Sequence, residues 1–258
     1  MIVDWAELSS AELGTNLAQT TLVIPIGATE QHGPNLPVGV DAMVAEHVAR
    51  RAAEQVTDRR VLVAPVLAYG SSHHHLPRAG TLSLSSTTML AVLRDLLDSA
   101  AVTGVQRVLI LNGHGGNEDL ARQAARDSTL THPLVAAAVG YWSLAWDEVV
   151  DTARGYGISP VPGHAGSFET SLLLAMHPEL VTTTEVPPGV SATRAASRTH
   201  PLAGVVIERH GWIDVIGGYS DDPSPASAEA GRAILDKVVA KCAAFLTDFA
   251  SDIEPGTR

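Results

Sequence analysis

Short apolar runs alternate with amphipathic segments along the first half of the chain. Runs rich in β-branched residues predict buried strands at 21–27 (TLVIPIG), 60–66 and 106–112, with a weaker fourth at 134–141. Nearly continuous apolar strands are typical of a parallel sheet that is covered on both faces. The pattern therefore favours an α/β fold with a mainly parallel central sheet.

Segments with helical spacing of apolar residues lie between and after these runs. They predict helices at 42–56, 87–103, 118–127, 167–176 and 227–249. We expect Asp41 to cap the first helix, and Ser85 or Ser86 to cap the second. The last helix could pack on the sheet or on a neighbouring subunit, and its periodicity does not decide between them.

Two polar, turn-rich stretches interrupt the second half of the chain. We interpret 186–201 (VPPGVSATRAASRTHP) as a loop over the site rather than a domain boundary, because only about 60 residues follow it. The stretch 221–225 (DDPSP) is a similar break. There is no internal repeat, so a single domain over 1–258 is expected.

Composition excludes several classes of function. Hydrophobic residues make up 45% of the 258 residues, which is enough to bury a large core. With 17 basic and 28 acidic residues the net charge is −11, which disfavours nucleic acid and anionic membranes as partners. The lone Cys242 can form no intrachain disulfide, and neither a secretion signal nor a membrane span is evident. These features fit a cytoplasmic protein.

The first group of chemically capable residues follows the first predicted strand. Glu30 and His32 are two residues apart, a spacing that points both side chains the same way in an extended segment. Asp41 comes nine residues after His32, and the intervening Pro and Gly residues can fold it back. A mixed set of carboxylates and imidazole suits Zn²⁺, Mn²⁺ or Fe²⁺. The alternative is a polar loop followed by an ordinary helix cap.

Two further groups lie in glycine-rich segments. His114 sits within 112–117 (NGHGGN), where glycines allow the backbone to approach a ligand; the alternatives are a phosphate cradle or a tight turn. The segment fits neither GxGxxG nor the P-loop. Glu169 lies near a helix start, where it could bind a cation or reach back to cap the loop. His164, in the loop before it, could act as a general acid or base.

Together these groups supply three carboxylates and two imidazoles, all expected at strand ends or in adjoining loops. Two metal ions that share one carboxylate would use the whole set. Such a pair polarises a carbonyl group and lowers the pKa of water towards neutrality. The sequence therefore predicts metal-assisted hydrolysis by Glu30, His32, Asp41, His114 and Glu169.

The motifs, taken together, resemble the creatininase (creatinine amidohydrolase) family. The matching segments occur in family order at 27–37 with Asp41, 79–84, 112–117 and 163–171. The resemblance implies a three-layer α/β/α sandwich and a homo-oligomer, often a hexamer. It also implies a dinuclear metal centre that hydrolyses non-peptide C–N bonds in small amides or lactams.

The resemblance also implies a role for each residue. One ion would be held by Glu30, Asp41 and His114, and the other by His32, Asp41 and Glu169, so that Asp41 bridges them. His164 matches the catalytic histidine that passes a proton to the leaving nitrogen. Four further residues are expected to bind a small, polar substrate: His75, Arg78, Tyr141 and Trp142. The run at 73–75 could instead be an exposed histidine-rich loop.

Two departures from creatininase proper disfavour creatinine as the substrate. Gly116 stands where that enzyme has a carboxylate, and Pro160 stands where it has a tryptophan. Other activities within the family are a peptidase of a small modified peptide, a deformylase of a nucleotide precursor and a hydrolase of a cyclic keto-sugar. Outside these lies a non-catalytic metal-binding scaffold, which would have no need of a base such as His164 beside the metal.

Overall fold

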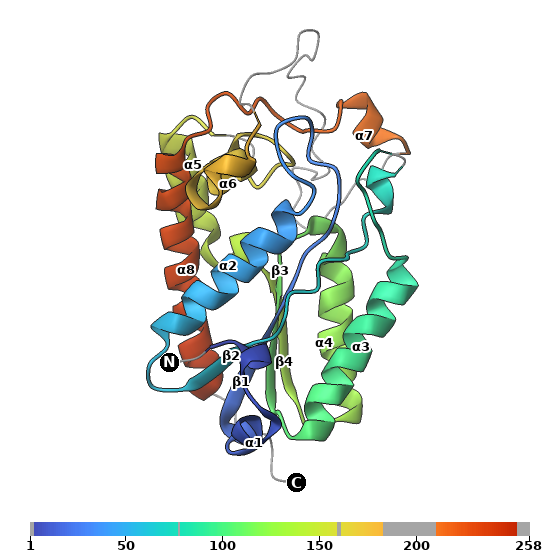
Figure 1. The fold of residues 1–258 in the computed structure, drawn as a ribbon, viewed down its shortest axis with the longest axis vertical. Helices are drawn as coiled ribbons and strands as arrows, with labels where there is room; N and C mark the ends of the chain where they lie inside the picture. The colour runs from blue at the N-terminus through green and yellow to red at the C-terminus, as the bar shows by residue number, and fades with distance from the viewer. Residues whose placement is uncertain (1–2, 77, 159–160, 183–209, 252–258) are drawn as a thin grey trace.

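Four parallel strands form the centre of the protein in this computed structural model, which describes residues 3–76, 78–158, 161–182 and 210–251. The strands lie in the order β2-β1-β3-β4, and every neighbouring pair is parallel (Figure 1). Their bounds are Thr20–Ile26 (β1), Arg60–Val63 (β2), Arg107–Asn112 (β3) and Val135–Gly140 (β4). The expected parallel sheet is therefore confirmed.

Helices cover both faces of this sheet. Their bounds are Ser10–Gly14 (α1), Val40–Gln55 (α2), Ser86–Thr103 (α3), Glu118–Thr131 (α4), Trp146–Gly155 (α5), Ser167–Met176 (α6), Trp212–Val215 (α7) and Ala228–Ser251 (α8). Short 3-10 helices lie at Trp5–Glu7, Leu17–Gln19, His73–His75, Gly115–Asn117, Tyr141–Ala145 and Pro178–Leu180. No helix among the described residues is long and apolar enough to cross a membrane.

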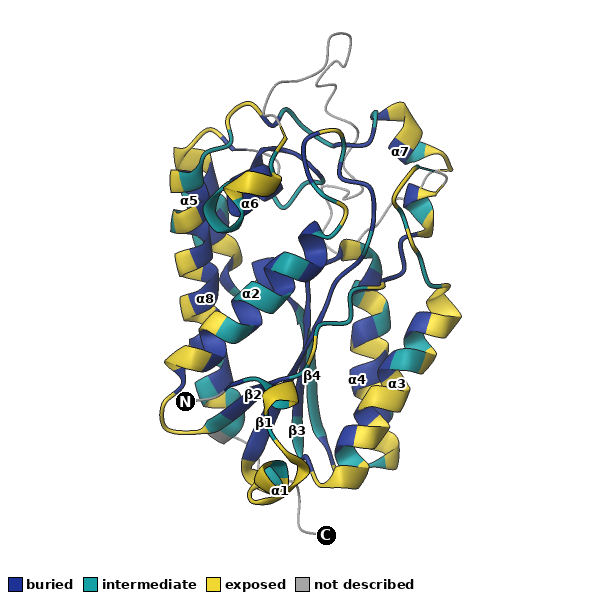
Figure 2. Ribbon diagram, viewed as in Figure 1, coloured by how far each residue is buried: buried dark blue, intermediate teal, exposed yellow. Residues whose placement is uncertain are grey.

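Alternating side chains of each strand enter two different cores. On β1, Leu22, Ile24 and Ile26 pack with α3 and α4, whereas Val23 packs on the opposite face with α2 and α8. This period of two follows from the pleat of a strand. Figures 1 and 2 show α3 and α4 on one side of the strands and α2, α5, α6 and α8 on the other. The fold is therefore the three-layer α/β/α sandwich that the family resemblance implied.

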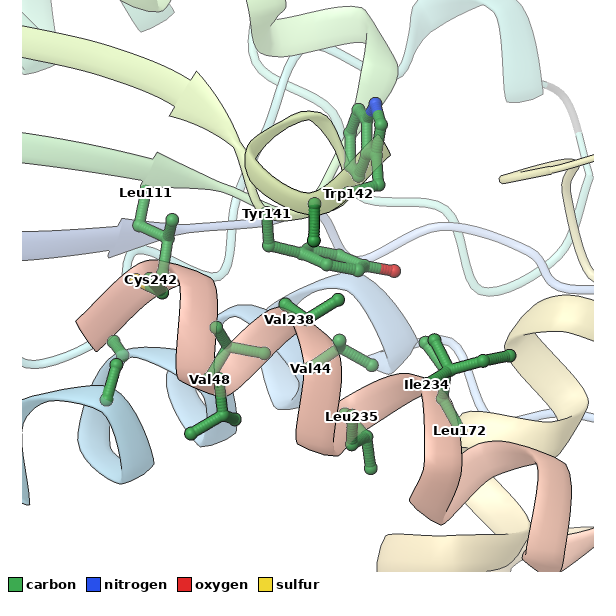
Figure 3. Packing of buried hydrophobic residues seen from close by; sticks show 14 of the residues in the cluster. Val44, Val48, Leu111, Tyr141, Trp142, Leu172, Ile234, Leu235, Val238 and Cys242 are labelled. Carbon is green, nitrogen blue, oxygen red and sulfur yellow. The ribbon is translucent and has the colours of Figure 1, made fainter. Parts of the chain in front are cut away.

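The final helix buries one of its faces within its own chain. Ile234, Val238 and Cys242 of α8 are buried against α2 and α6 (Figure 3). Their spacing of four residues places them on one face of the helix. Burial raises the pKa of the Cys242 thiol to about 12, so this cysteine behaves as a small apolar core residue.

Some local predictions need correction. Asp41 does not cap α2, because the helix begins at Val40, two residues before the predicted start, with Gly39 at its N-cap; Asp41 lies buried in its first turn. The serine cap of α3 is confirmed, and the residue is Ser85. The second strand ends at Val63, before the predicted end at 66. Helices α1, α5 and α7 were not predicted.

The predicted loop at 186–201 and Pro160 lie outside the described residues. The stretch at 221–225 contains no helix or strand, as expected of a turn-rich break.

The close contact between α6 and α8 predicts an unusual response to Gly231→Ala. Alanine normally stabilises a helix by about 1 kcal/mol relative to glycine. At position 231, however, a Cβ would overlap the backbone carbonyl of Ser171. We expect the variant to lose about 1–3 kcal/mol in the free energy of unfolding, measured by urea denaturation. Gly155→Ala in α5 is the control, because nothing lies within 4 Å of its Cβ position; its stability should be unchanged or slightly raised.

Candidate metal centre

The candidate centre lies where the carboxyl ends of β1 and β3 meet the first turn of α2. Gly27 follows β1, and Gly113 follows β3. A Cβ at Gly27 would overlap the backbone nitrogen of Ala42, and one at Gly113 would overlap the carbonyl oxygen of Asp41. These two glycines therefore let the first turn of α2 rest directly on the strand ends. The contact places Asp41 between the two loops that carry Glu30 and His114.

Asp41 directs its two carboxylate oxygens to different histidines. Its Oδ1 lies 3.3 Å from His32 Nε2, and its Oδ2 lies 3.1 Å from His114 Nδ1. Two further carboxylates complete the arrangement: His32 Nε2 is 3.6 Å from Glu169 Oε2, and His114 Nδ1 is 3.3 Å from Glu30 Oε2. All five residues named from the sequence as metal ligands are thus brought together.

Four groups of side chains in this region have potential ligand atoms close enough to share an ion. Two of them are the sets implied by the family resemblance. Of the other two, one contains His164 and one contains His74 and His75. The four are Glu30–Asp41–His114, His32–Asp41–Glu169, Glu30–His32–His164 and Glu30–His74–His75. Asp41 is common to the first two, and Glu30 to the other two and the first.

The donor atoms suit divalent cations. The five residues are only 1% to 7% exposed, yet Glu30 Oε1 and Oε2, His32 Nε2 and Asp41 Oδ2 form no hydrogen bond of acceptable geometry. Burying carboxylate oxygens without well-formed hydrogen bonds is costly, and metal coordination would remove that cost. Imidazole nitrogen and carboxylate oxygen are also the ligands preferred by Zn²⁺ and Mn²⁺.

Electrostatics within the centre favours cations. Burial opposes protonation of His32, but attraction to Asp41 and Glu169 outweighs it and raises the pKa of His32 to about 10. Burial likewise opposes charge on His114, yet Glu30 and Asp41 raise its pKa well above the ordinary value. Burial raises the pKa of Glu169 to about 8, helped by the charge of Asp41. Binding of a metal would therefore release protons from this cluster.

His164 differs from the other two histidines. Its Nδ1 lies 3.6 Å from Glu30 Oε1, and its ring centroid lies 4.5 Å from that of His32. Burial together with repulsion from His32 and His75 lowers the pKa of His164 well below its ordinary value. A neutral imidazole beside the candidate metal ligands can accept a proton and later return it.

Gln31 and His75, both next to Glu30, form a polar network, and the sequence analysis did not predict the role of Gln31. The side-chain amide nitrogen of Gln31 lies 2.9 Å from His75 Nδ1 and 3.0 Å from His164 Nε2, and it donates to the carbonyl of Gly218 at 3.0 Å. His75 Nε2 in turn lies 3.1 Å from Glu30 Oε1. Gln31 therefore links His164 to His75, whose ring faces Glu30. Its position between Glu30 and His32 was the available signal.

The four predicted substrate residues occupy different surroundings. His75 is buried beside Glu30, whereas Arg78 pairs with Asp214 at 3.1 Å and donates to the carbonyl of Gly217. Tyr141 and Trp142 are 2% and 7% exposed and pack edge to face in the core (Figure 3). Burial raises the pKa of Tyr141 well above its ordinary value, and the charges of Glu169 and Asp41 add to this shift.

The glycine-rich segment after β3 holds His114 in place. The backbone N–H of His114 donates to Asn112 Oδ1, and Asn117 Nδ2 donates to the carbonyl of Gly27. A side chain at Gly116 would overlap the His114 ring and the carbonyl of Ser71. The carboxylate that creatininase proper has at this position is therefore incompatible with the local conformation here.

The third group of residues differs from the sequence prediction in one respect. The loop at 163–166 does not follow a strand; it lies between α5 and α6. Glu169 lies in the first turn of α6 and accepts the backbone N–H of Ala165. The carboxylate thus makes the capping contact that was the alternative, while it also faces His32.

Curated relatives resemble the chain over most or much of its length. A mycofactocin precursor peptide peptidase of Mycobacterium ulcerans is 32% identical and covers 90% of this chain and 88% of its own. A creatinine amidohydrolase of Pseudomonas putida is also 32% identical, but the match covers 62% of this chain and 65% of the relative. A 3-dehydro-scyllo-inosose hydrolase of Thermotoga maritima is 26% identical and covers 62% and 51%.

Solved structures agree with these matches. A crystal structure of creatinine amidohydrolase (creatininase) superposes with a TM-score of 0.78 at 27% identity, covering 98% of this chain and 99% of its own. A manganese creatininase matches with a TM-score of 0.78 at 26% identity, covering 96% and 98%. A zinc–zinc mutant creatininase matches with a TM-score of 0.76 at 27% identity, with the same coverage.

The model of one family, described as creatinine amidohydrolase, matches residues 6–246, a range that includes all of the candidate ligands. The chain therefore belongs to the creatininase family of metal-dependent amidohydrolases.

Proposed function

We propose that the protein hydrolyses a C–N bond of a small, polar amide or lactam at a centre that holds two divalent metal ions. The observation that carries this proposal is the division of the Asp41 carboxylate between His32 and His114. A carboxylate whose two oxygens face separate ligand sets can bridge two ions. The manganese and zinc forms of related creatininases support these metals as candidates.

Each side chain has a defined part in this proposal. Glu30, Asp41 and His114 would hold one ion, and His32, Asp41 and Glu169 would hold the other. When bound, the ions would supply Lewis acidity, which polarises a carbonyl group and lowers the pKa of water. The burial of the ligands strengthens electrostatic interactions at this position.

His164 transfers the proton in this reaction. Its Nδ1 is close to Glu30 but His164 belongs to neither proposed ligand set, so the ring is free to take a proton from the attacking water. Donation of that proton to the departing nitrogen would complete cleavage of the C–N bond. A non-catalytic scaffold would not require a neutral imidazole at this position.

The bridging role of Asp41 predicts the metal content of variants. Wild-type protein reconstituted with Zn²⁺ or Mn²⁺ should bind two ions per chain, measured by plasma mass spectrometry after removal of free metal. Asp41→Ala should lose both ions, because both ligand sets include this residue. His114→Ala is the comparison and should lose one. Wild-type protein that remains metal-free after reconstitution would refute the proposed function, and full metal content in Asp41→Ala would refute the bridge.

His164→Ala should separate chemistry from metal binding. We expect a fall in kcat of about 10²–10⁴-fold, with both ions retained, since general acid–base catalysis contributes on this scale. Steady-state kinetics and metal analysis of the same preparation provide the measurement. His132→Ala, far along the chain at the end of α4, is a matched control and should leave kcat unchanged. Unchanged turnover in His164→Ala would exclude the proton-transfer role.

A peptidase is the second candidate function. It is favoured by the mycobacterial peptide peptidase, which matches 90% of the chain, whereas creatinine amidohydrolase matches 62%. The lack of space for a side chain at Gly116 also separates the site from that of creatininase proper. The same centre and the same proton transfer by His164 would serve a peptide bond.

A substrate panel distinguishes the two candidates. Metal-loaded enzyme would be incubated with creatinine and other lactams, formamides, cyclic keto-sugars and short peptides, and the products followed by mass spectrometry. We expect turnover of a lactam or another small amide and little turnover of creatinine. Cleavage confined to peptides would establish the second candidate in place of the first. The Asp41→Ala variant controls for contaminating hydrolases.

The remaining expectations concern the protein in its cellular setting. We propose that residues 1–258 form a single domain, that the protein is cytoplasmic, and that it assembles as a homo-oligomer, with a hexamer as the family's common form. These proposals rest on the family resemblance and on the composition of the chain. Sedimentation of the purified protein measures the assembly directly.

A further inference from the structure

A short segment distant in sequence from the candidate ligands is hydrogen-bonded to the loops of the site. We call residues 217–221 the strap. Its carbonyl groups accept hydrogen bonds from two site loops: Gly217 from Arg78, and Gly218 from the side chain of Gln31. The strap ends at Asp221, which is also the first residue of the turn-rich stretch 221–225.

The last two residues of the strap hold the loop that carries His164. The backbone N–H of His164 donates to Ser220 Oγ at 2.7 Å, and the backbone N–H of Ser220 donates to the carbonyl of His164 at 2.8 Å. The hydroxyl of Ser220 donates in turn to Asp221 Oδ1 at 2.8 Å. A serine has one hydroxyl proton, so when that proton is donated to Asp221 the oxygen lone pairs can accept the backbone N–H of His164.

Asp221 also fixes the start of α6. Its Oδ2 accepts both the backbone N–H and the hydroxyl of Ser167, each at 2.9 Å. A carboxylate at the first turn of a helix satisfies a free N–H group and interacts favourably with the helix dipole. Ser167 is two residues before Glu169, one of the proposed metal ligands. Asp221 therefore restrains the segment at two points: at His164 through Ser220, and directly at Ser167.

We propose that Asp221 is a positioning residue for hydrolysis: through Ser220 and Ser167 it sets the place of the His164 ring relative to Glu169. The inference rests on the proposed function, because His164 moves the proton in that reaction. Asp221 itself contacts neither of the proposed ligand sets. Its effect passes through two hydrogen-bonded serines, and a displacement of about 1 Å at a reacting group can cost about 100-fold in rate.

The test compares Asp221→Asn and Ser220→Ala with wild-type enzyme. Asparagine keeps the shape of aspartate but places an N–H₂ group where one carboxylate oxygen accepts a hydrogen bond. We expect kcat to fall about 10- to 100-fold in both variants, with KM nearly unchanged, for the substrate turned over best in the panel above. Metal content per chain should equal that of wild type. Asp222→Asn is the matched control, since Asp222 accepts only the local N–H of Ser224 among the hydrogen bonds described, and its kcat should be unchanged.

Hydrogen exchange provides a readout that does not depend on activity. Amides of 163–170 should exchange faster in Asp221→Asn, whereas Ser220→Ala should affect His164 and leave the amide of Ser167 protected. A variant that loses kcat only in proportion to its metal content would overturn the positioning role, as would unchanged kcat in both variants. If wild-type protein binds no metal and hydrolyses nothing, the proposed function fails. Unchanged hydrogen exchange at 163–170 in Asp221→Asn would refute the positioning role of Asp221, independently of the proposed function.

Discussion

The arrangement of the whole site depends on one buried carboxylate that faces two histidines. Asp41 is 3% exposed, and its oxygens point to His32 and His114, which lie on different loops. A buried charge is tolerated only where it is paired or coordinated. The two loops must therefore meet on either side of this residue. The first turn of α2 provides the required place because glycine at 27 and 113 lets the helix rest on the strand ends.

The fold imposes this meeting before any chemistry is considered. Parallel strands carry their loops to the same edge of the sheet, and ligands of open α/β sheets bind at that edge. The neighbouring strands β1 and β3 deliver the loops of Glu30 and His114, and α2 follows β1 in the chain. Hydrophobic burial on both faces of the sheet stabilises the platform without involving the polar edge. The candidate ligands thus come from loops after the strands, which carry Glu30, His32 and His114, and from the first turns of α2 and α6, which carry Asp41 and Glu169.

Sequence reasoning singled out the candidate ligands that the structure brings together because their signals are local. Each of Glu30 and His114 lies just beyond an apolar run, and the family motifs confirmed the order of the segments. The same reasoning gave Asp41 the wrong local role, since a carboxylate before an apolar run also reads as a helix cap. The structure places it two residues after the N-cap Gly39, within the first turn of α2, with its side chain facing the site. Hydrogen bonds between distant segments, such as Gln31 to Gly218 and Ser167 to Asp221, leave no periodic or motif signal at all. Those contacts could not be predicted from one sequence.

Proton balance links the site's architecture to its proposed chemistry. Glu30, Asp41 and Glu169 bring three carboxylates into a buried volume, and without metal the histidines at 32 and 114 offset that charge, as the raised pKa values of both show. In the proposed function, divalent ions would take over this role on binding and would displace the histidine protons. His164 is the exception, because burial and repulsion from His32 and His75 lower its pKa. The same cluster that favours cations on its ligands thus keeps one neighbouring imidazole neutral, and a neutral imidazole is the state in which a proton can be accepted from water. His32 and His164 thus differ in charge within one site. Two carboxylates, Asp41 and Glu169, lie close to His32, whereas the backbone of His164 is hydrogen-bonded to the strap at 217–221.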